Sequence, residues 1–225
     1  MDAEQLCRSA QINHCRRTDP VKIRKSPPQQ KRAPLRPMNT PYLWFPPEDY
    51  PQSILGSCNY QSSPDRVIFI EGKPLTERIL TPSFQFTAPL SRVAKLDILP
   101  NTIGVPLISQ RVASLLTEIC PAEFQLIPSQ IETRDAPLDG YSILNVLVEI
   151  SGIDHARSSI HMLAKLNCII SIRRLRYASG AMGAHHLARD REYSPFLWVS
   201  DEVVRKFALA NFRCYEFKPP EAIHP

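Results

Sequence analysis

The stretch that decides the fold is VPLISQRVASLLTEICPAEFQLIP, residues 105–128. Its opening apolar run ends at Ser109, a residue type that often caps the N-terminus of a helix. Apolar residues then recur at helical spacing, at Val112, Leu115, Leu116 and Ile119. Pro121 ends that pattern, and Phe124, Leu126 and Pro128 alternate as in a strand. The stretch therefore predicts an apolar strand, a serine-capped helix and a second strand.

The same order of features returns in residues 196–219, FLWVSDEVVRKFALANFRCYEFKP. Matching positions lie 91 residues apart, as for Ser109 with Ser200, Leu116 with Phe207 and Pro128 with Pro219. Each helix has to bury its apolar stripe, and a sheet is the natural surface for it. We therefore predict two similar strand–Ser-capped helix–strand units. The alternative is coincidence, because capped amphipathic helices are common and the polar positions do not match.

Other segments complete the prediction of an α+β fold with a mixed or mainly antiparallel sheet and a few packed helices. Residues 67–70, 84–86, 141–150 and 168–175 are typical of strands, and 141–150 is apolar enough to be central. Residues 153–166 predict a short helix with Asp154 as a cap. Residues 178–192, which contain Gly180 and Gly183, predict an exposed loop or hairpin tip.

The chain divides by composition into residues 1–37 and 38–225. The first segment has nine basic and three acidic residues, five prolines and no aromatic residue. Such a segment buries too little apolar surface to offset its ordering entropy, so we expect a disordered basic arm. The remainder, with 18 basic and 19 acidic residues, is the expected folded domain. A natural start at Met38 is an alternative.

The expected location is the cytoplasm. The sequence has no apolar run of the roughly 18 to 20 residues that a membrane span needs, and its first residues do not resemble a signal peptide. Its six cysteines show no C-x-x-C spacing, which favours reduced thiols over a disulfide framework.

No motif in the sequence predicts catalysis, a cofactor or a metal. A phosphate-binding glycine loop and the G-x-S-x-G motif are both missing. The neighbouring pairs His14–Cys15 and His185–His186 lack the paired spacing of a zinc site. Asp154–His155 is better explained by a cap beside an exposed histidine than by a catalytic pair. We therefore expect a binding protein and not an enzyme, with no cofactor and no membrane partner.

The candidate partner-binding residues are charged or aromatic side chains in expected loops and on one strand face. They are Arg173, Arg174, Arg176, Tyr177, His185, His186, Arg189, Arg191, Glu132 and Asp135. Compact clusters of this kind favour contact with another macromolecule, since arginine and aromatic residues dominate binding energy at interfaces.

Several of these stretches together resemble the bacterial immunity protein 11 family. They are residues 105–116 and 124–128, residues 141–147 with Ile153, Asp154 and Ser158, and residues 198–207 with 215–217. The chain departs from the family pattern at Phe212-Arg213-Cys214, where a glycine is common. The resemblance implies an antitoxin that binds and neutralises a cognate toxin, such as a secretion-system effector used in bacterial competition. It implies no catalytic residues.

Two other functions stay open on the sequence alone. The basic arm fits a nucleic-acid-binding regulator, whose binding would weaken steeply with salt, although a solvated tail explains the same composition. An enzyme of unfamiliar type would need a pocket in which two carboxylates, or a histidine and a cysteine, converge.

Overall fold

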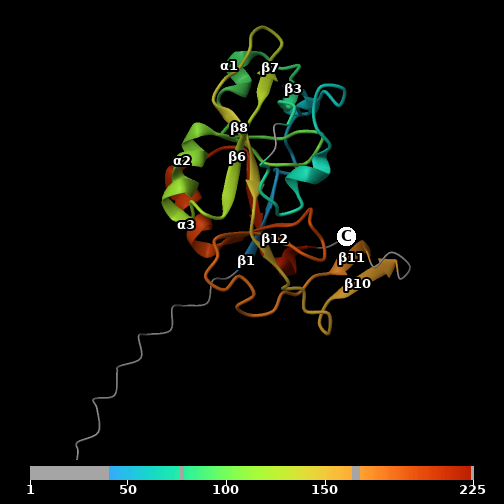
Figure 1. Cartoon of the computed structure of the whole chain (residues 1–225). Coiled ribbons are helices and arrows are strands. Elements are labelled where there is room, and N and C mark those ends of the chain that lie inside the picture. The colour runs from blue at the N-terminus through green and yellow to red at the C-terminus, as the bar shows by residue number, and fades with distance from the viewer. Residues whose placement is uncertain (1–40, 77–78, 164–167, 224–225) are drawn as a thin grey trace, which may run out of the picture. The chain divides into compact units, whose positions relative to one another are not determined.

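The computed structural model describes residues 41–76, 79–163 and 168–223. These residues belong to one compact unit, Arg36–Pro225. The prediction of a basic arm over residues 1–37, and the alternative start at Met38, lie outside the described residues. Within them the chain has an α+β fold, as predicted: antiparallel and mixed sheets with three α-helices (Figure 1).

The largest sheet has the strand order β14-β1-β13-β12-β9. Its strands are β1 (Pro41–Phe45), β9 (Glu149–Ile150), β12 (Leu187–Asp190), β13 (Leu197–Ser200) and β14 (Glu216–Lys218). All neighbours pair antiparallel except β12 and β9. Segments from both ends of the described chain therefore meet in one sheet.

The second sheet has the order β4-β5-β8-β6 and is antiparallel. Its strands are β4 (Ile98–Leu99), β5 (Leu107–Ser109), β6 (Phe124–Pro128) and β8 (Tyr141–Val146). Residues 141–150 were predicted as a single central strand. They instead form β8, which is interior in this sheet, and β9, which pairs in the other sheet.

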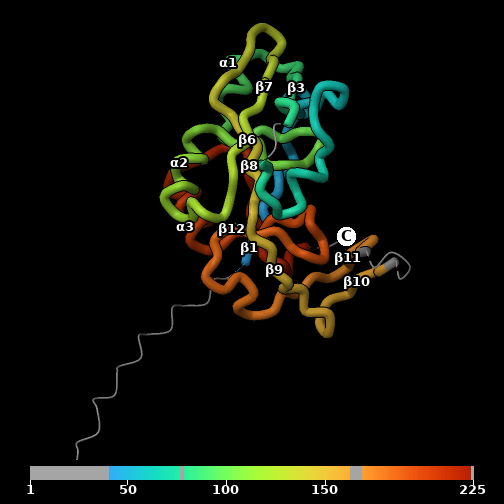
Figure 2. The backbone as a smooth tube through the Cα atoms, viewed as in Figure 1, coloured from blue at the N-terminus to red at the C-terminus, as the bar shows by residue number. Residues whose placement is uncertain are grey.

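Smaller elements flank these two sheets. A three-stranded sheet, β2-β3-β7, joins β2 (Ser57–Cys58), β3 (Ser83–Gln85) and β7 (Gln130–Glu132), beside the short helix α1 (Leu90–Val93). An antiparallel ribbon joins β10 (Ser159–Leu163) to β11 (Cys168–Arg174) and projects from the rest of the unit (Figure 2). Short 3-10 helices are η1 (Gln52–Ile54), η2 (Arg66–Phe69) and η3 (Pro220–Ala222).

The helices α2 (Gln110–Ile119) and α3 (Asp201–Ala210) lie side by side (Figure 1). Each begins at the predicted serine, because the Oγ of Ser109 or Ser200 accepts the backbone N–H three residues on, at 3.4 Å. In each unit the strand before the helix and the strand after it lie in the same sheet with one other strand between them. That strand is β8 between β5 and β6, and β1 between β13 and β14. This order is the same in both sheets, but the equivalence of the two units stays a prediction.

The core between the helices and the large sheet is aromatic. Phe207 of α3 is fully buried, with ring centroids 4.9–5.2 Å away in Trp44, Phe212, Tyr215 and Phe217. These rings come from β1, β14 and the segment after α3, so the helix holds the sheet's edge together. Among the described residues no helix is long and apolar enough to cross a bilayer.

Two strand and helix predictions are wrong. Residues 67–70 lie largely in η2 because the Asp65 carboxylate accepts the N–H of Val67, at 2.9 Å, and closes a turn. Residues 153–163 form a turn followed by β10 and not a helix. Asp154 does act as a cap, accepting the N–H of Arg157 at 3.1 Å, but pairing with β11 then extends the chain.

The prediction that residues 178–192 form an exposed loop is wrong in its second half. Residues 187–190 are β12, a fully buried strand between β13 and β9. The charged side chains of Arg189 and Asp190 made this segment look exposed. Both are nevertheless buried, because β12 is an interior strand and polar groups within the fold accept hydrogen bonds from these side chains or donate hydrogen bonds to them.

Candidate partner-binding surface

The structure does not bring the ten candidate residues together in one place. Glu132 and Asp135 lie at β7 and in the loop after it, whereas Arg173 and Arg174 lie on β11 at the other end of the unit (Figure 1). Their binding role therefore stays a prediction, and the surroundings of each residue decide which of them can meet a partner.

Asp135 is exposed but serves the local fold. Its Oδ1 accepts hydrogen bonds from the backbone N–H of Leu90 at 2.7 Å and from the Thr133 hydroxyl at 3.1 Å. The bond from Leu90 is the main reason why the pKa of Asp135 lies below its usual range. The carboxylate thus fixes the loop after β7 against the start of α1. Glu132, beside it, is exposed.

His185 and His186 are held by Glu123, a residue that the sequence did not single out. The Glu123 Oε1 lies 3.0 Å from His185 Nδ1, and its Oε2 accepts the N–H groups of His186 and Leu187 at 2.9 and 2.7 Å. These bonds tie the entry of β12 to the loop after α2. A carboxylate that accepts strand amides 63 and 64 positions away has no local sequence signal.

The pair of Ser200 and His186 is not arranged for nucleophilic catalysis. The Ser200 Oγ lies 2.9 Å from His186 Nδ1, and Glu202 approaches the same ring nitrogen at 3.9 Å. A catalytic relay needs the orienting carboxylate on the opposite nitrogen. The Ser200 hydroxyl also accepts the helix N–H of Val203, so it works as a cap.

The thiol of Cys120, which lies near Glu123, is equally unsuited to chemistry. Burial, together with the Glu123 charge, raises the pKa of Cys120 to about 12. At neutral pH the thiol is therefore protonated, and only the thiolate is a good nucleophile. Cys58 and Cys214 are also free thiols.

Tyr177 and Arg189, both candidates for surface contact, are buried. The Tyr177 hydroxyl donates to the Asp190 carboxylate, which also accepts the N–H groups of Glu192 and Tyr193 at 2.8 and 3.1 Å. Burial raises the pKa of both Tyr177 and Asp190. These bonds join the end of the β10–β11 ribbon to β12, so Tyr177 lies inside the fold.

Arg189 is 1% exposed and lies among backbone carbonyl groups. The nearest acceptors of its guanidinium are the carbonyls of Ser194, Pro195 and Phe69 at 3.4–3.5 Å. Burial lowers its pKa to about 10, so the charge persists at neutral pH. Arg189 therefore supports the loop after β12 from inside, whereas Arg191, two residues on, is exposed.

Gly152, at the base of the ribbon, gives a direct test of this packing. A Cβ there would overlap the Tyr177 ring and lie 2.7 Å from the Cβ of Ala181. We expect Gly152→Ala to lower the free energy of unfolding by about 1–3 kcal/mol, because the tyrosine cannot move without breaking its bond to Asp190. Chemical denaturation measures this change. The matched variant Ser151→Ala, at an exposed neighbour, is expected to change stability by less than about 0.5 kcal/mol. Equal effects of the two variants would contradict the tight packing.

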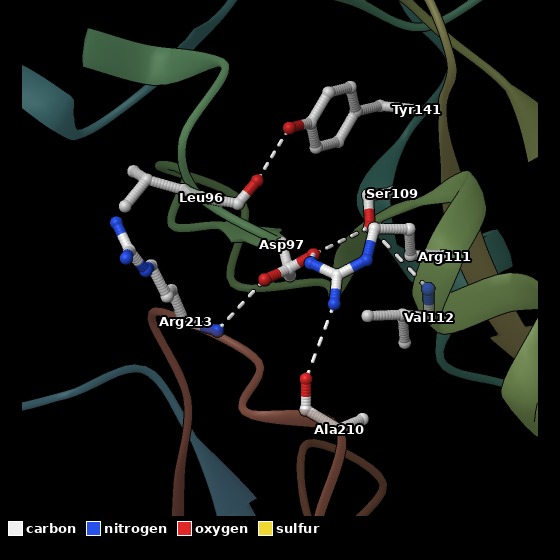
Figure 3. Close-up of polar contacts among 8 residues, drawn as sticks. All are labelled: Leu96, Asp97, Ser109, Arg111, Val112, Tyr141, Ala210 and Arg213. Atoms are coloured by element: carbon white, nitrogen blue, oxygen red, sulfur yellow. Dashed lines mark hydrogen bonds and ion pairs between the residues drawn. The ribbon is translucent and has the colours of Figure 1, made fainter.

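Asp97 is the centre of a second cluster of polar contacts that sequence reasoning missed (Figure 3). Its carboxylate accepts hydrogen bonds from the Ser109 hydroxyl at 3.3 Å, from Arg111 Nη1 at 2.9 Å and from the Arg213 N–H at 3.0 Å. Arg111 also donates to the carbonyl of Ala210 at 3.2 Å. The start of α2 and the end of α3 are thus joined through one buried side chain.

Two neighbouring pockets share Phe45, Pro46 and Tyr50 in their walls. Their charged lining residues are Glu48 and Lys218, which form an ion pair. Neither pocket brings together two carboxylates, or a histidine and a cysteine. Within the described ranges no group of three or more His, Cys, Asp or Glu side chains is placed to hold a metal ion. These two pockets therefore offer a surface of mainly apolar residues with one ion pair between Glu48 and Lys218.

Comparison of the sequence with known proteins identifies a family. No curated protein matches the chain. The model of a family described as "Immunity protein family (Imm11)" matches residues 22–221, which is most of the chain. The extent of this match shows that the chain belongs to the Imm11 immunity protein family.

Proposed function

We propose that this chain binds one cognate bacterial toxin and neutralises it by covering the toxin's active site. Membership of the immunity protein family, over residues 22–221, is the observation that carries this proposal. Such a protein protects the cell that makes it, and its relatives, in competition between bacteria. It acts in the cytoplasm, where it meets the toxin before the toxin meets its substrate.

The contacts within the fold support a binding role. Ser200, His186 and Cys120 combine residue types that enzymes use for nucleophilic catalysis. Here Ser200 caps α3, His186 contacts the Ser200 hydroxyl, and Cys120 packs in the core. The side chains that stay available on the surface are basic, acidic and apolar groups on loops, on the helices and on the ribbon. These are groups that recognise another protein.

A stable complex with the toxin needs an interface of at least standard size. An interface of standard size buries about 800 Å² on each partner, and a few residues supply most of its binding energy. Complete protection requires that almost no toxin is free, so we expect a Kd of about 1 nM or lower, which corresponds to about −12 kcal/mol.

Co-expression with the toxin domain encoded by the neighbouring gene tests the proposal. Cells that carry both genes are expected to survive, whereas cells with the toxin domain and an empty vector die. The two purified proteins are expected to elute together in size-exclusion chromatography. Survival no better than with the empty vector, together with separate elution, would rule out the proposed function.

A further inference from the structure

We infer that the β10–β11 ribbon is the recognition element of this protein and that it binds an acidic surface of a partner protein. This inference rests on the proposed function, because the partner in question is the toxin. It identifies which part of the immunity protein makes the decisive contacts, and what kind of surface those contacts need.

Charge distribution is the first argument. Residues 155–176, which include the ribbon, hold five Lys or Arg side chains, two histidines and no Asp or Glu. Residues 38–225 hold 18 basic and 19 acidic residues in total, so 13 basic and 19 acidic residues remain outside this segment. The segment thus carries +5 on a domain that is otherwise −6. A charge asymmetry of this size steers association with an acidic partner.

The basic side chains of the strand β11 are available for such a partner. Arg173 and Arg174 are exposed, and neither has an ion pair or side-chain hydrogen bond in the described part of the chain. Arg157, by contrast, pairs with Asp154 at 2.5 Å. An acidic surface in a complex would supply the carboxylates that these two exposed arginines could pair with.

Irregular strand pairing is the second argument. In the register of the ribbon, Ile160 faces Ile172 while Ser159 faces Arg174, which leaves Arg173 without an opposite residue. A second shift, between His161 and Met162, leaves Ile170 in the same position. Bulges of this kind turn side chains outward and interrupt the ladder that a further strand would need. The ribbon therefore presents side chains to a partner and does not add a strand to it.

The exposed apolar side chains of the ribbon decide between a protein and a nucleic acid. Ile170 is 54% exposed, and Met162, next to it in the ribbon, is exposed as well. Apolar side chains gain free energy when an apolar protein surface covers them, but phosphate groups offer no such cover. Residues 155–176 contain no Phe, Tyr or Trp on which bases would stack. An acidic protein surface with an apolar centre fits both kinds of side chain.

The attachment of the ribbon supports a role in binding, because a rigid element loses less entropy in a complex. Tyr177, which follows β11, forms a bridge with Ile153 and bonds to Asp190. The centroids of the Tyr177 and Trp198 rings are 3.8 Å apart. The ribbon thus projects from the fold, and the buried rings of Tyr177 and Trp198 hold the end at which it is attached.

A pair of matched double variants tests the inference against the purified toxin domain. The variant I170S/R173E alters the two bulged residues. The control R205E/L209S makes the same changes of residue type and charge on the exposed side of α3, where Leu209 is 82% exposed. We expect the first variant to bind at least about 30-fold more weakly than the natural chain, and the control to stay within about threefold. R173K, which keeps the charge, is expected to retain binding within about fivefold.

Each outcome bears on the inference in a defined way. Failure of the natural chain to bind the toxin domain removes the proposed function and, with it, this inference. Binding that I170S/R173E retains, or that both double variants lose equally, removes this inference only. Loss of binding to a short DNA duplex or single strand, rather than to the toxin domain, would assign the ribbon to nucleic acid instead. Circular dichroism checks folding, and R173E alone replaces a double variant that does not fold.

Discussion

Replacing Phe207 with alanine is expected to lower the free energy of unfolding by about 3–5 kcal/mol, the largest effect of any single change considered for this protein. The side chain is 0% exposed and its ring meets four others edge-on or tilted, from β1, β14 and the segment after α3. Alanine removes those contacts and leaves a cavity. The neighbouring rings cannot fill it, because the strands hold their backbones in place.

The matched control lies two residues further along the same helix. Leu209 is 82% exposed, so Leu209→Ala is expected to change stability by less than about 0.5 kcal/mol, although it also removes apolar atoms from α3. Urea denaturation monitored by circular dichroism measures both variants. If Phe207→Ala costs less than about 1 kcal/mol, the aromatic cluster does not hold α3 to the sheet as the structure indicates.

The second large effect is expected at Asp97. Asp97→Ala should lower the free energy of unfolding by about 2–3 kcal/mol, because the Ser109 hydroxyl and the Arg213 N–H lose their acceptor in a buried place. The carboxylate also lies at the N-terminus of α2, where the helix dipole favours a negative charge. Asp97→Asn keeps the shape but turns an acceptor into a donor, so it should cost nearly as much.

A substitution of Arg111 shows whether the buried hydrogen bonds of Asp97 or its ion pair contributes more to stability. Its side chain is 64% exposed, whereas that of Asp97 is 7% exposed, although the two form one ion pair. Arg111→Ala is therefore expected to cost about 1 kcal/mol or less, since solvent already screens this arginine. Thermal denaturation of the two single variants measures the difference. Equal losses would mean that the ion pair, and not the buried hydrogen bonds of Asp97, stabilises the contact between the helices.

The elements that were predicted correctly have their signals within a few neighbouring residues. Ser109 and Ser200 each cap a helix by accepting the backbone N–H of the residue three positions on. The spacing of the apolar residues in α2 and α3 directly indicates one buried face on each helix. The residues 67–70 were misread because a short apolar run fits a strand or a turn equally well, and the Asp65 side chain closed the turn.

The candidate site was harder to predict, since a charged side chain in the sequence does not reveal its surroundings. Arg189 and Arg173 are chemically identical, yet one is buried among carbonyl groups and the other stands on a bulge. The bulge itself depends on how β10 and β11 pair across the ribbon. Glu123 and Asp97 hold the fold together through partners far along the chain, which the residues beside them do not indicate.

Local chemistry in the sequence alone determined the class of fold, the two capped helices and the strands that follow them. The family was a matter of resemblance, and the match over residues 22–221 showed it. Only the tertiary structure decided which polar residues are buried, which strands pair, and that β10 and β11 form a separate basic ribbon. The reason is distance along the chain. A helix cap or an apolar stripe is complete within one turn or two, but the Asp97 carboxylate meets the Arg213 amide across 116 positions. Contacts of that length form only when the whole chain has folded.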